Sequence, residues 1–200
     1  MGFIKRIKEE IEIIRQRDPA IHSSMEVFLY PSFKVMLHYR LAHKLYMNRH
    51  YFLARWVSQR GVRKTGIEIH PGAQIGKGFF IDHGNGVIIG ETTIIGDNVK
   101  VYQGVTIGAL STRGGQKLKG VKRHPTIEDN VIIYAGASIL GGETVIGRGA
   151  VIGSNAFITS SIEPGARVSI KNQELSIRTG ERKELVASEM ETDSSWFYVI

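Results

Sequence analysis

Aliphatic residues recur at every sixth position through the middle of the chain, and this period restricts the folds that the chain can adopt. The series are Ile69, Ile75, Ile81 and Val87; Ile89, Ile95, Val101 and Ile107; Ile127, Ile133 and Ile139; and Ile146, Ile152 and Ile158. A six-residue period matches neither the 3.6-residue turn of an α-helix nor a long alternating strand. It predicts short strands that turn a corner after each hexad, with aliphatic ladders inside: a parallel β-helix of the hexapeptide type.

The residues before the repeat have a helical pattern. Isoleucines lie at helical spacing over 3–16, and Pro31 suits the first turn of a second helix over 31–47. A third helix is expected over 51–59, with a glycine-bounded connection over 61–66. We therefore expect an N-terminal α-helical domain, residues 1–65, that caps the open end of the β-helix.

The repeat itself predicts a β-helix domain over residues 66–170, interrupted once by a long loop at 109–125. Loops of this length in a compact repeat are usually functional or disordered. Residues 171–200 are polar and charged and predict a flexible C-terminal tail. The aromatic end of this tail either packs on the body of the protein or serves as a docking peptide.

Composition excludes several classes of function. The chain has no cysteine, so a disulfide, a thiolate metal site and a cysteine nucleophile are all excluded. No apolar run spans a bilayer, and the first residues lack a signal-peptide core, so we expect a cytoplasmic protein with no membrane partner. The net charge of +7 favours a solvated basic surface. The cations do not alternate with aromatics, so no nucleic-acid partner is expected.

A cluster of cations lies in the 109–125 loop and suits a phosphate-bearing cofactor. Its members are Arg113, Lys117, Lys119, Lys122 and Arg123. The loop ends at Arg123 and His124. A guanidinium binds a carboxylate through two hydrogen bonds, so Arg123 either holds a substrate carboxylate or is one more solvated charge.

His83 is the candidate general base, because a neutral imidazole beside two glycines accepts a proton near pH 7 from a ligand that approaches closely. Its candidate partner is Glu68, fifteen residues earlier and somewhat under one coil away. The alternative is a histidine that merely completes a turn, and the residues alone slightly favour it. His70, His83 and His124 lack the short spacing of zinc ligands, so no metal is expected.

Several segments resemble the serine O-acetyltransferases, within hexad repeats and at matching separations. They are Gln16–Ala20, Gly66–Ala73, Phe80–Thr92, Arg123–Ile127 and Ala135–Ala137. The resemblance implies transfer of acetyl from acetyl-CoA to the hydroxyl of L-serine, giving O-acetyl-L-serine and CoA in cysteine biosynthesis. It also implies a left-handed β-helix in a homotrimer, in some members paired into a dimer of trimers, with active sites between neighbouring subunits.

The resemblance assigns roles by position. His83 matches the catalytic base and Glu68 its acidic partner, which is commonly aspartate in the family. The positions that hold serine match Asp18, Asp82, Arg123 and His124. The positions that hold acetyl-CoA match Gly108, Ala109, Ala135 and Ser154. The chain departs from the common Gly-Gly-Thr at Gly108-Ala109-Leu110, beside the expected path of the cofactor.

The resemblance further implies that L-cysteine inhibits by occupying the serine site. Ile200 matches the terminal isoleucine that several members insert into cysteine synthase, which makes that enzyme a candidate partner. Two alternatives remain open on the same scaffold. One is an acetyltransferase for a sugar or amine acceptor; the other is a non-catalytic trimeric scaffold that binds cysteine synthase.

Overall fold

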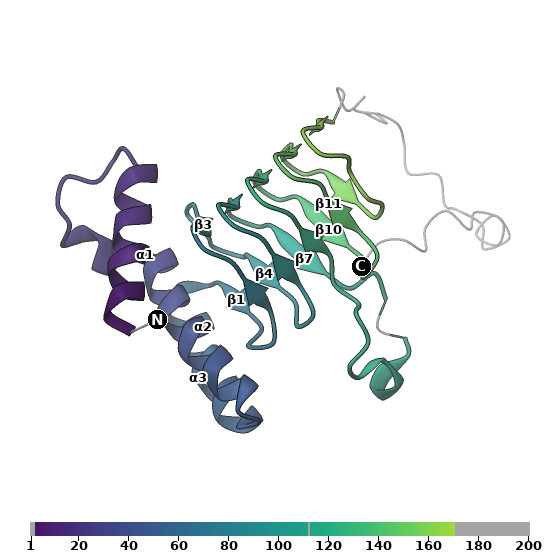
Figure 1. Ribbon diagram of the computed structural model, residues 1–200, viewed down its shortest axis with the longest axis horizontal. Helices are drawn as coiled ribbons and strands as arrows, with labels where there is room; N and C mark the ends of the chain where they lie inside the picture. The colour runs from purple at the N-terminus through teal and green to yellow at the C-terminus, as the bar shows by residue number, and fades with distance from the viewer. Residues whose placement is uncertain (1–2, 112, 171–200) are drawn as a thin grey trace, which may run out of the picture.

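A computed structural model of the chain, which describes residues 3–111 and 113–170, contains a three-sided β-helix with a cap of helices at one end (Figure 1). The first face holds β1 (Glu68–Ile69), β4 (Ile88–Ile89), β7 (Thr106–Gly108), β10 (Ser138–Leu140) and β13 (Phe157–Ile158). The second holds β2 (Gln74–Ile75), β5 (Ile94–Ile95), β8 (Thr126–Ile127) and β11 (Val145–Ile146). The third holds β3 (Phe80–Ile81), β6 (Lys100–Val101), β9 (Ile132–Ile133), β12 (Val151–Ile152) and β14 (Arg167–Val168). Every pair of neighbouring strands is parallel.

The hexad residues form the core, as the six-residue period predicts. On the first face, Ile69, Ile89, Ile107, Ile139 and Ile158 stack in register, each at most 8% exposed. Each strand points one residue inward and its neighbour outward, so a short strand suffices to fill the prism before the chain turns. Removing these aliphatic ladders from water is the main stabilising contribution that the β-helix offers.

The series in the sequence restarts at Ile89, two residues after Val87, and the structure contains this two-residue phase slip. Ile89 is the residue that pairs with Ile69. Ile81 and Ile89 are eight residues apart, so the edge between the third and first faces contains two extra residues at this coil. Val87 is also fully buried, two residues before Ile89 and therefore on the same inward side of the chain.

Three α-helices and a 3₁₀ turn precede the β-helix: α1 (Phe3–Arg17), η1 (Glu26–Leu29), α2 (Pro31–Met47) and α3 (Tyr51–Thr65). Pro31 opens α2 as expected, since its fixed φ suits the first turn. The expected connection at 61–66 is wrong, because α3 continues to Thr65 and ends at Gly66, whose φ is 68°. Glycine suits position 61 of α3 because α2 lies close beside it: a Cβ there would lie 3.1 Å from the Cβ of His38.

The cap satisfies backbone carbonyls at the end of the β-helix. The Tyr39 hydroxyl donates to the carbonyl of Ala73 at 2.6 Å, and the Ser58 hydroxyl donates to that of Ile69 at 3.0 Å. Arg40 donates to the carbonyl of Ile75 at 3.1 Å. Unpaired backbone groups are costly when they are buried, so these side chains replace the partners that another coil would supply.

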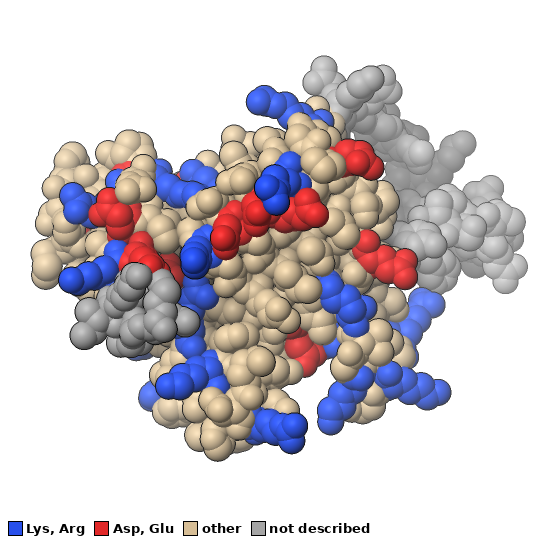
Figure 2. All heavy atoms as spheres, in the orientation of Figure 1, with Lys and Arg blue, Asp and Glu red and all other residues tan. Residues whose placement is uncertain are grey.

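The loop between β7 and β8 carries a second 3₁₀ turn, η2 (Gly115–Leu118). Figure 2 shows lysine and arginine side chains gathered along the lower rim of the face in view, over the helical cap and this loop. None of the helices within the described residues is long and apolar enough to cross a membrane.

Candidate active site

The two extra residues between β3 and β4 place His83 outside the prism. His83 has a φ of 59°, in the left-handed region, and its side chain is 75% exposed. Non-glycine residues adopt this conformation rarely, and such strain is found preferentially at functional sites. The phase slip in the hexads therefore turns a histidine outward at the edge between the third and first faces.

Asp82 lies beside His83, with Oδ1 3.9 Å from its Nε2. The other oxygen of Asp82, Oδ2, forms an ion pair with Nζ of Lys100 on the next coil, at 3.0 Å. Burial acts to lower the pKa of Lys100, but hydrogen bonds to Tyr102 and Asp82 outweigh it and raise the pKa. Lys100 is thus a fixed cation that orients the Asp82 carboxylate next to His83.

Asp18 joins this group from the segment after α1. Its Oδ1 accepts the backbone N–H of Ala20 at 2.8 Å. This bond and the hydroxyl of Tyr30 lower the pKa of Asp18, with smaller contributions from His83 and Lys100 in the same direction. The bond to Asp18 raises the pKa of Tyr30 to about 12. The structure therefore brings together three of the predicted residues: Asp18, Asp82 and His83.

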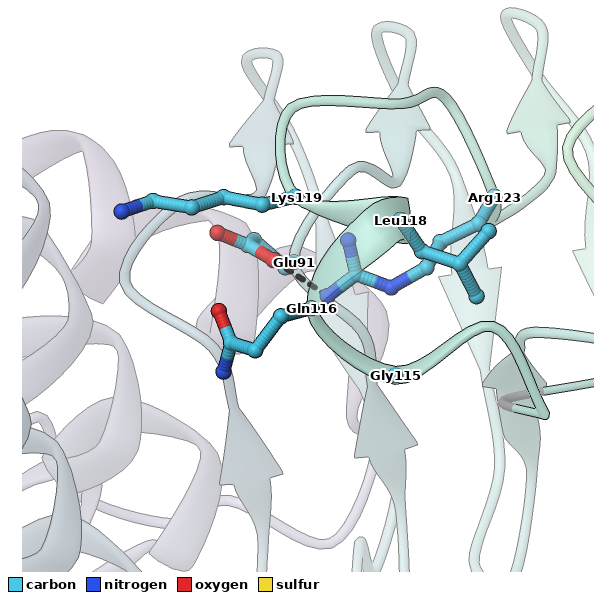
Figure 3. Close-up of a pocket in the computed structure, with 6 residues that line it drawn as sticks. All are labelled: Glu91, Gly115, Gln116, Leu118, Lys119 and Arg123. Carbon is cyan, nitrogen blue, oxygen red and sulfur yellow. Dashed lines mark hydrogen bonds and ion pairs between the residues drawn. The ribbon is translucent and has the colours of Figure 1, made fainter.

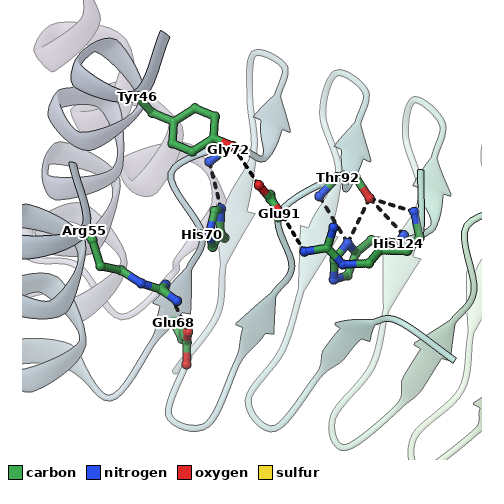
Figure 4. Close-up of polar contacts among 9 residues, drawn as sticks. Tyr46, Arg55, Glu68, His70, Gly72, Glu91, Thr92 and His124 are labelled. Atoms are coloured by element: carbon green, nitrogen blue, oxygen red, sulfur yellow. Dashed lines mark hydrogen bonds and ion pairs between the residues drawn. The ribbon is translucent and has the colours of Figure 1, made fainter. Parts of the chain in front are cut away.

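Arg123 and His124 lie at a different edge, between the first and second faces, where the long loop re-enters at β8. Thr92 fixes His124: its N–H donates to Nδ1 at 3.1 Å, and its Oγ1 lies 2.9 Å from the same atom (Figure 4). The backbone N–H groups of His124 and Arg123 both donate to Oγ1 of Thr92, at 3.0 and 2.9 Å. Because Nδ1 accepts the Thr92 N–H, the ring carries its proton on Nε2.

His124 is only 7% exposed, and burial, with the nearby Arg123 cation, lowers its pKa to about 4. Burial likewise lowers the pKa of His70 to about 4. Nδ1 of His70 accepts the N–H of Gly72 at 3.0 Å. Both rings are therefore neutral near pH 7, and each can donate from Nε2.

Glu91 lies between His70 and Arg123. The Tyr46 hydroxyl, from α2, donates to Oε1 of Glu91 at 2.7 Å, and Arg123 Nη2 donates to Oε2 (Figure 4). Burial acts to raise the pKa of Glu91, but these two hydrogen bonds outweigh it and lower the pKa. Burial and the bond to Glu91 raise the pKa of Tyr46 to about 12.

A cavity of about 440 Å³ opens beside this cluster, under the long loop. Figure 3 shows the residues that line it, with η2 beside the Glu91–Arg123 pair. They are Glu91, Gly115, Gln116, Leu118, Lys119 and Arg123. The cavity therefore presents cations and an amide to a ligand, with one carboxylate that is already engaged.

Glu68 does not contact His83 among the residues that the structure describes. Its carboxylate instead lies 3.8 Å from Arg55 of α3 (Figure 4). It occupies the outward position of β1, in register with Ile88. The pairing of Glu68 with His83 stays a prediction, and Asp82 is the acidic neighbour that the single chain gives the histidine.

The predicted cofactor residues are also divided between the two edges. Gly108 ends β7, and Ala109 begins the loop that leads to Arg123. Ala135 and Ser154 follow β9 and β12, at the edge that carries His83. No group of three metal-ligating side chains is found within 3–111 and 113–170. The Ile200 prediction lies outside the described residues.

Sequence reasoning missed Tyr46, Glu91, Thr92 and Lys100 as parts of these clusters. Glu91 and Arg123 are thirty-two residues apart, across a loop whose length is not set by the hexads, so no period relates them. Lys100 occupies an outward strand position, where a charged residue is ordinary. Only its proximity to Asp82 distinguishes it.

The parallel coils define the chain as a hexapeptide-repeat protein with a left-handed parallel β-helix, as predicted. No family model matches the sequence. The serine acetyltransferase of Bacillus licheniformis is 50% identical over 88 residues, 44% of this chain and 41% of that protein. That of Helicobacter pylori is 55% identical over 80 residues, 40% of this chain and 47% of that protein. These matches span less than half of the curated relatives' length.

Solved structures cover more of the chain. Entamoeba histolytica serine acetyltransferase isoform 3, in complex with cysteine, has a TM-score of 0.77 and 42% identity over 88% of this chain and 61% of its own. The Neisseria gonorrhoeae serine acetyltransferase, in complex with serine, has a TM-score of 0.75 and 32% identity over 86% of this chain and 68% of its own. The chain belongs to the serine acetyltransferase family, which confirms the resemblance seen in its sequence.

Proposed function

We propose that the chain transfers the acetyl group of acetyl-CoA to the hydroxyl of L-serine, in cysteine biosynthesis. The observation that carries the proposal is the exposed His83 flanked by Asp18 and Asp82, on a scaffold whose solved relatives bind serine and cysteine. An imidazole beside carboxylates suits the removal of a proton from a weak nucleophile.

In this reaction His83 takes the proton of the serine hydroxyl as the oxygen attacks the thioester carbonyl carbon. The C–S bond then breaks, and the imidazolium returns the proton to the CoA thiolate, so atoms and charge balance. A positioned base of this kind contributes roughly 10²–10⁴-fold. With no cysteine in the chain, a cysteine acyl-enzyme is excluded, and direct transfer between two bound substrates is the simplest course.

The charges around the two edges suit the amino acid. Asp18 and Asp82 would pair with the serine ammonium, while Arg123 and the Nε2–H of neutral His124 would bind its carboxylate. Glu68 would orient the second nitrogen of His83 once Arg55 releases it. The cationic loop and the Gly108–Ala109 and Ala135–Ser154 positions would bind acetyl-CoA.

The division of these residues between two edges supports a homotrimer. One edge carries His83 and another carries Arg123. A single serine therefore meets both residues only if the His83 edge of one copy faces the Arg123 edge of the next copy. Such a head-to-tail contact closes into a ring, and three copies match the three-sided prism. A further pairing of two trimers through the helical cap is part of this proposal.

L-Cysteine has the ammonium and carboxylate of serine, and we expect it to compete with serine for the same groups. The bound cysteine in the Entamoeba histolytica relative supports this expectation. We further propose that Ile200 docks in cysteine synthase, because a terminal carboxylate on a branched apolar residue mimics an amino acid. Deleting Ile200 should abolish co-purification with that enzyme without changing acetyl transfer.

The test is CoA thiol release from acetyl-CoA with L-serine, compared with amino sugars and other amines. Wild-type turnover of serine that is competitively inhibited by L-cysteine supports the proposal. A preference for sugars would establish the alternative acceptor class. No turnover with any acceptor, in a chain that binds cysteine synthase, would establish the scaffold alternative.

Two inactive variants test the shared site. His83→Ala and Arg123→Ala should each lose activity and still assemble, as judged by light scattering. When the two are co-expressed, mixed trimers contain interfaces with both native residues, so activity should return to a substantial fraction of wild type. Failure of the mixture to regain activity would contradict a site built by two copies. Glu68→Gln should lower kcat while Arg55→Gln should not.

A further inference from the structure

Lys100 is a cation that two aromatic rings enclose on the outward side of β6. Its side chain is only 20% exposed, although lysine side chains usually reach solvent. Nζ lies 5.3 Å from the ring centroid of Phe80 and 4.6 Å from that of Tyr102. Both rings are fixed in turn: Phe80 is buried in one cluster with Phe33 of the cap, and Tyr102 stacks on Tyr134 at a centroid distance of 5.0 Å. The ammonium is therefore held in place, and water screens its charge only partly.

This ammonium faces the negative charge around His83. Nζ of Lys100 lies 3.0 Å from Oδ2 of Asp82, and Oδ1 of the same carboxylate lies 3.9 Å from Nε2 of His83. Asp18 lies close enough to interact electrostatically with both His83 and Lys100. Two carboxylates beside an imidazole favour its charged form, which cannot accept a proton from a substrate. A fixed cation among them opposes that preference.

We infer that Lys100 is a positioning residue that sets the lower pH limit of catalysis: its charge offsets Asp18 and Asp82, so His83 stays a free base at lower pH than the two carboxylates alone would allow. The inference rests on the proposed function in taking His83 as the base. The effect on the imidazole itself does not depend on which acceptor is used.

The other groups near His83 leave this balance unchanged at neutral pH. Tyr30 stays neutral, because its bond to Asp18 raises its pKa to about 12. Burial acts to lower the pKa of Lys100, but its hydrogen bonds to Tyr102 and Asp82 outweigh burial, so it stays charged. Among the described residues, the charged and titratable groups around Asp82 and His83 are Asp18, Glu26, Tyr30, Lys100 and Tyr102. Lys100 is the one cation in that set.

In the proposed trimer, the next copy adds Arg123 to these surroundings. That guanidinium is already paired with Glu91, so the pair contributes little net charge. A comparison of Lys100 variants with the wild type also cancels this contribution, because the variants leave Arg123 and Glu91 unchanged.

The test replaces the charge of Lys100 and keeps its bulk. Lys100→Met retains the contacts with the rings, and Lys100→Arg retains the charge. Lys77→Met is the matched control, because it removes one exposed lysine from the edge between the second and third faces, away from His83.

Two readouts separate the inference from the proposed function. The first is the pH dependence of the rate at which diethylpyrocarbonate modifies His83, followed by peptide mass spectrometry, since the reagent attacks only the neutral ring. The second is the pH dependence of kcat/KM for L-serine, whose acid limb reports the essential base of the free enzyme.

Lys100→Met should move the midpoint of both curves up by about half a pH unit, a threefold loss on the acid limb; the shift is modest because the His83 side chain is 75% exposed and solvent screens it. Lys100→Arg and Lys77→Met should leave both midpoints in place. If Lys100→Met does not fold, Lys100→Gln, which keeps a hydrogen-bond donor for Asp82, decides in its place.

An unchanged modification midpoint in a folded, uncharged variant would overturn the inference, and so would a loss of activity that is equal at every pH. A shifted modification midpoint in a protein that does not turn over serine would uphold the role of Lys100 and reject only the proposed reaction.

Discussion

Replacing Gly90 by alanine should displace His124 without removing any polar side chain of the site. A Cβ at position 90 would lie 2.0 Å from Cδ2 of His124 and 2.2 Å from its Nε2. Ordinary contacts begin near 3.4 Å, so the ring must move by about 1.4 Å, the difference between 3.4 and 2.0. Nδ1 is held by Thr92, so the movement also breaks that contact.

The expected cost has two parts. Overpacking of this kind destabilises by about 1–3 kcal/mol. Misplacing a substrate-binding group by about 1 Å costs up to roughly 10²-fold in rate. We therefore expect Gly90→Ala to lower kcat/KM for L-serine by roughly 10- to 100-fold and to lower the melting temperature modestly.

Thiol release gives kcat/KM, and thermal unfolding gives the stability. Gly165→Ala is the control: its φ is 71°, so alanine is strained there, but no atom lies within 4 Å of the new Cβ. The control should lose comparable stability and keep its activity. A Gly90→Ala protein with kcat/KM within twofold of wild type would refute the placement of His124 in the substrate site.

Two further predictions concern stability. Ile89→Ala should cost about 2–5 kcal/mol of unfolding free energy, because Ile89 is only 1% exposed. Ile88 is 43% exposed, so Ile88→Ala should cost far less. Urea titration at fixed protein concentration compares the two variants, and equal losses of stability would contradict the inward–outward assignment. His70 and His124, with pKa values lowered from 6.5 to about 4, stay neutral in the folded chain while the unfolded chain takes up protons, so stability should fall as the pH drops from 6.5 to 4. His70→Asn should remove about one proton from this uptake, and an unchanged slope would show that His70 is already protonated in the folded state.

The hexads were sufficient to predict the β-helix because they record its core directly. Each inward residue, such as Ile107 or Ile133, must be aliphatic whichever coil it occupies. Helical spacing of apolar residues likewise predicts helices in the cap, but Gly61 leads the sequence pattern to end the third helix too early. Glycine here serves the close approach of α2, which is a contact with a distant segment and leaves no local pattern.

The site was predicted less completely. Motif resemblance identified His83 and Arg123, and the structure places them at two edges of one prism. The motif resemblance did not identify Glu91 or Lys100, because the contacts of these residues depend on which coils are neighbours. The Glu68–His83 pair stays a prediction, because the single chain gives Glu68 a different neighbour in Arg55.

The sequence by itself determined the scaffold, its inward ladders and the histidine expelled by the two-residue phase slip, because a repeating core needs the same kind of side chain at every turn. Only the tertiary structure decided which polar groups meet. Stacking brings Lys100 to Asp82 and Glu91 to both Tyr46 and Arg123, and such contacts depend on coil-to-coil neighbours and on the loop between them. The hexad period contains no information on either.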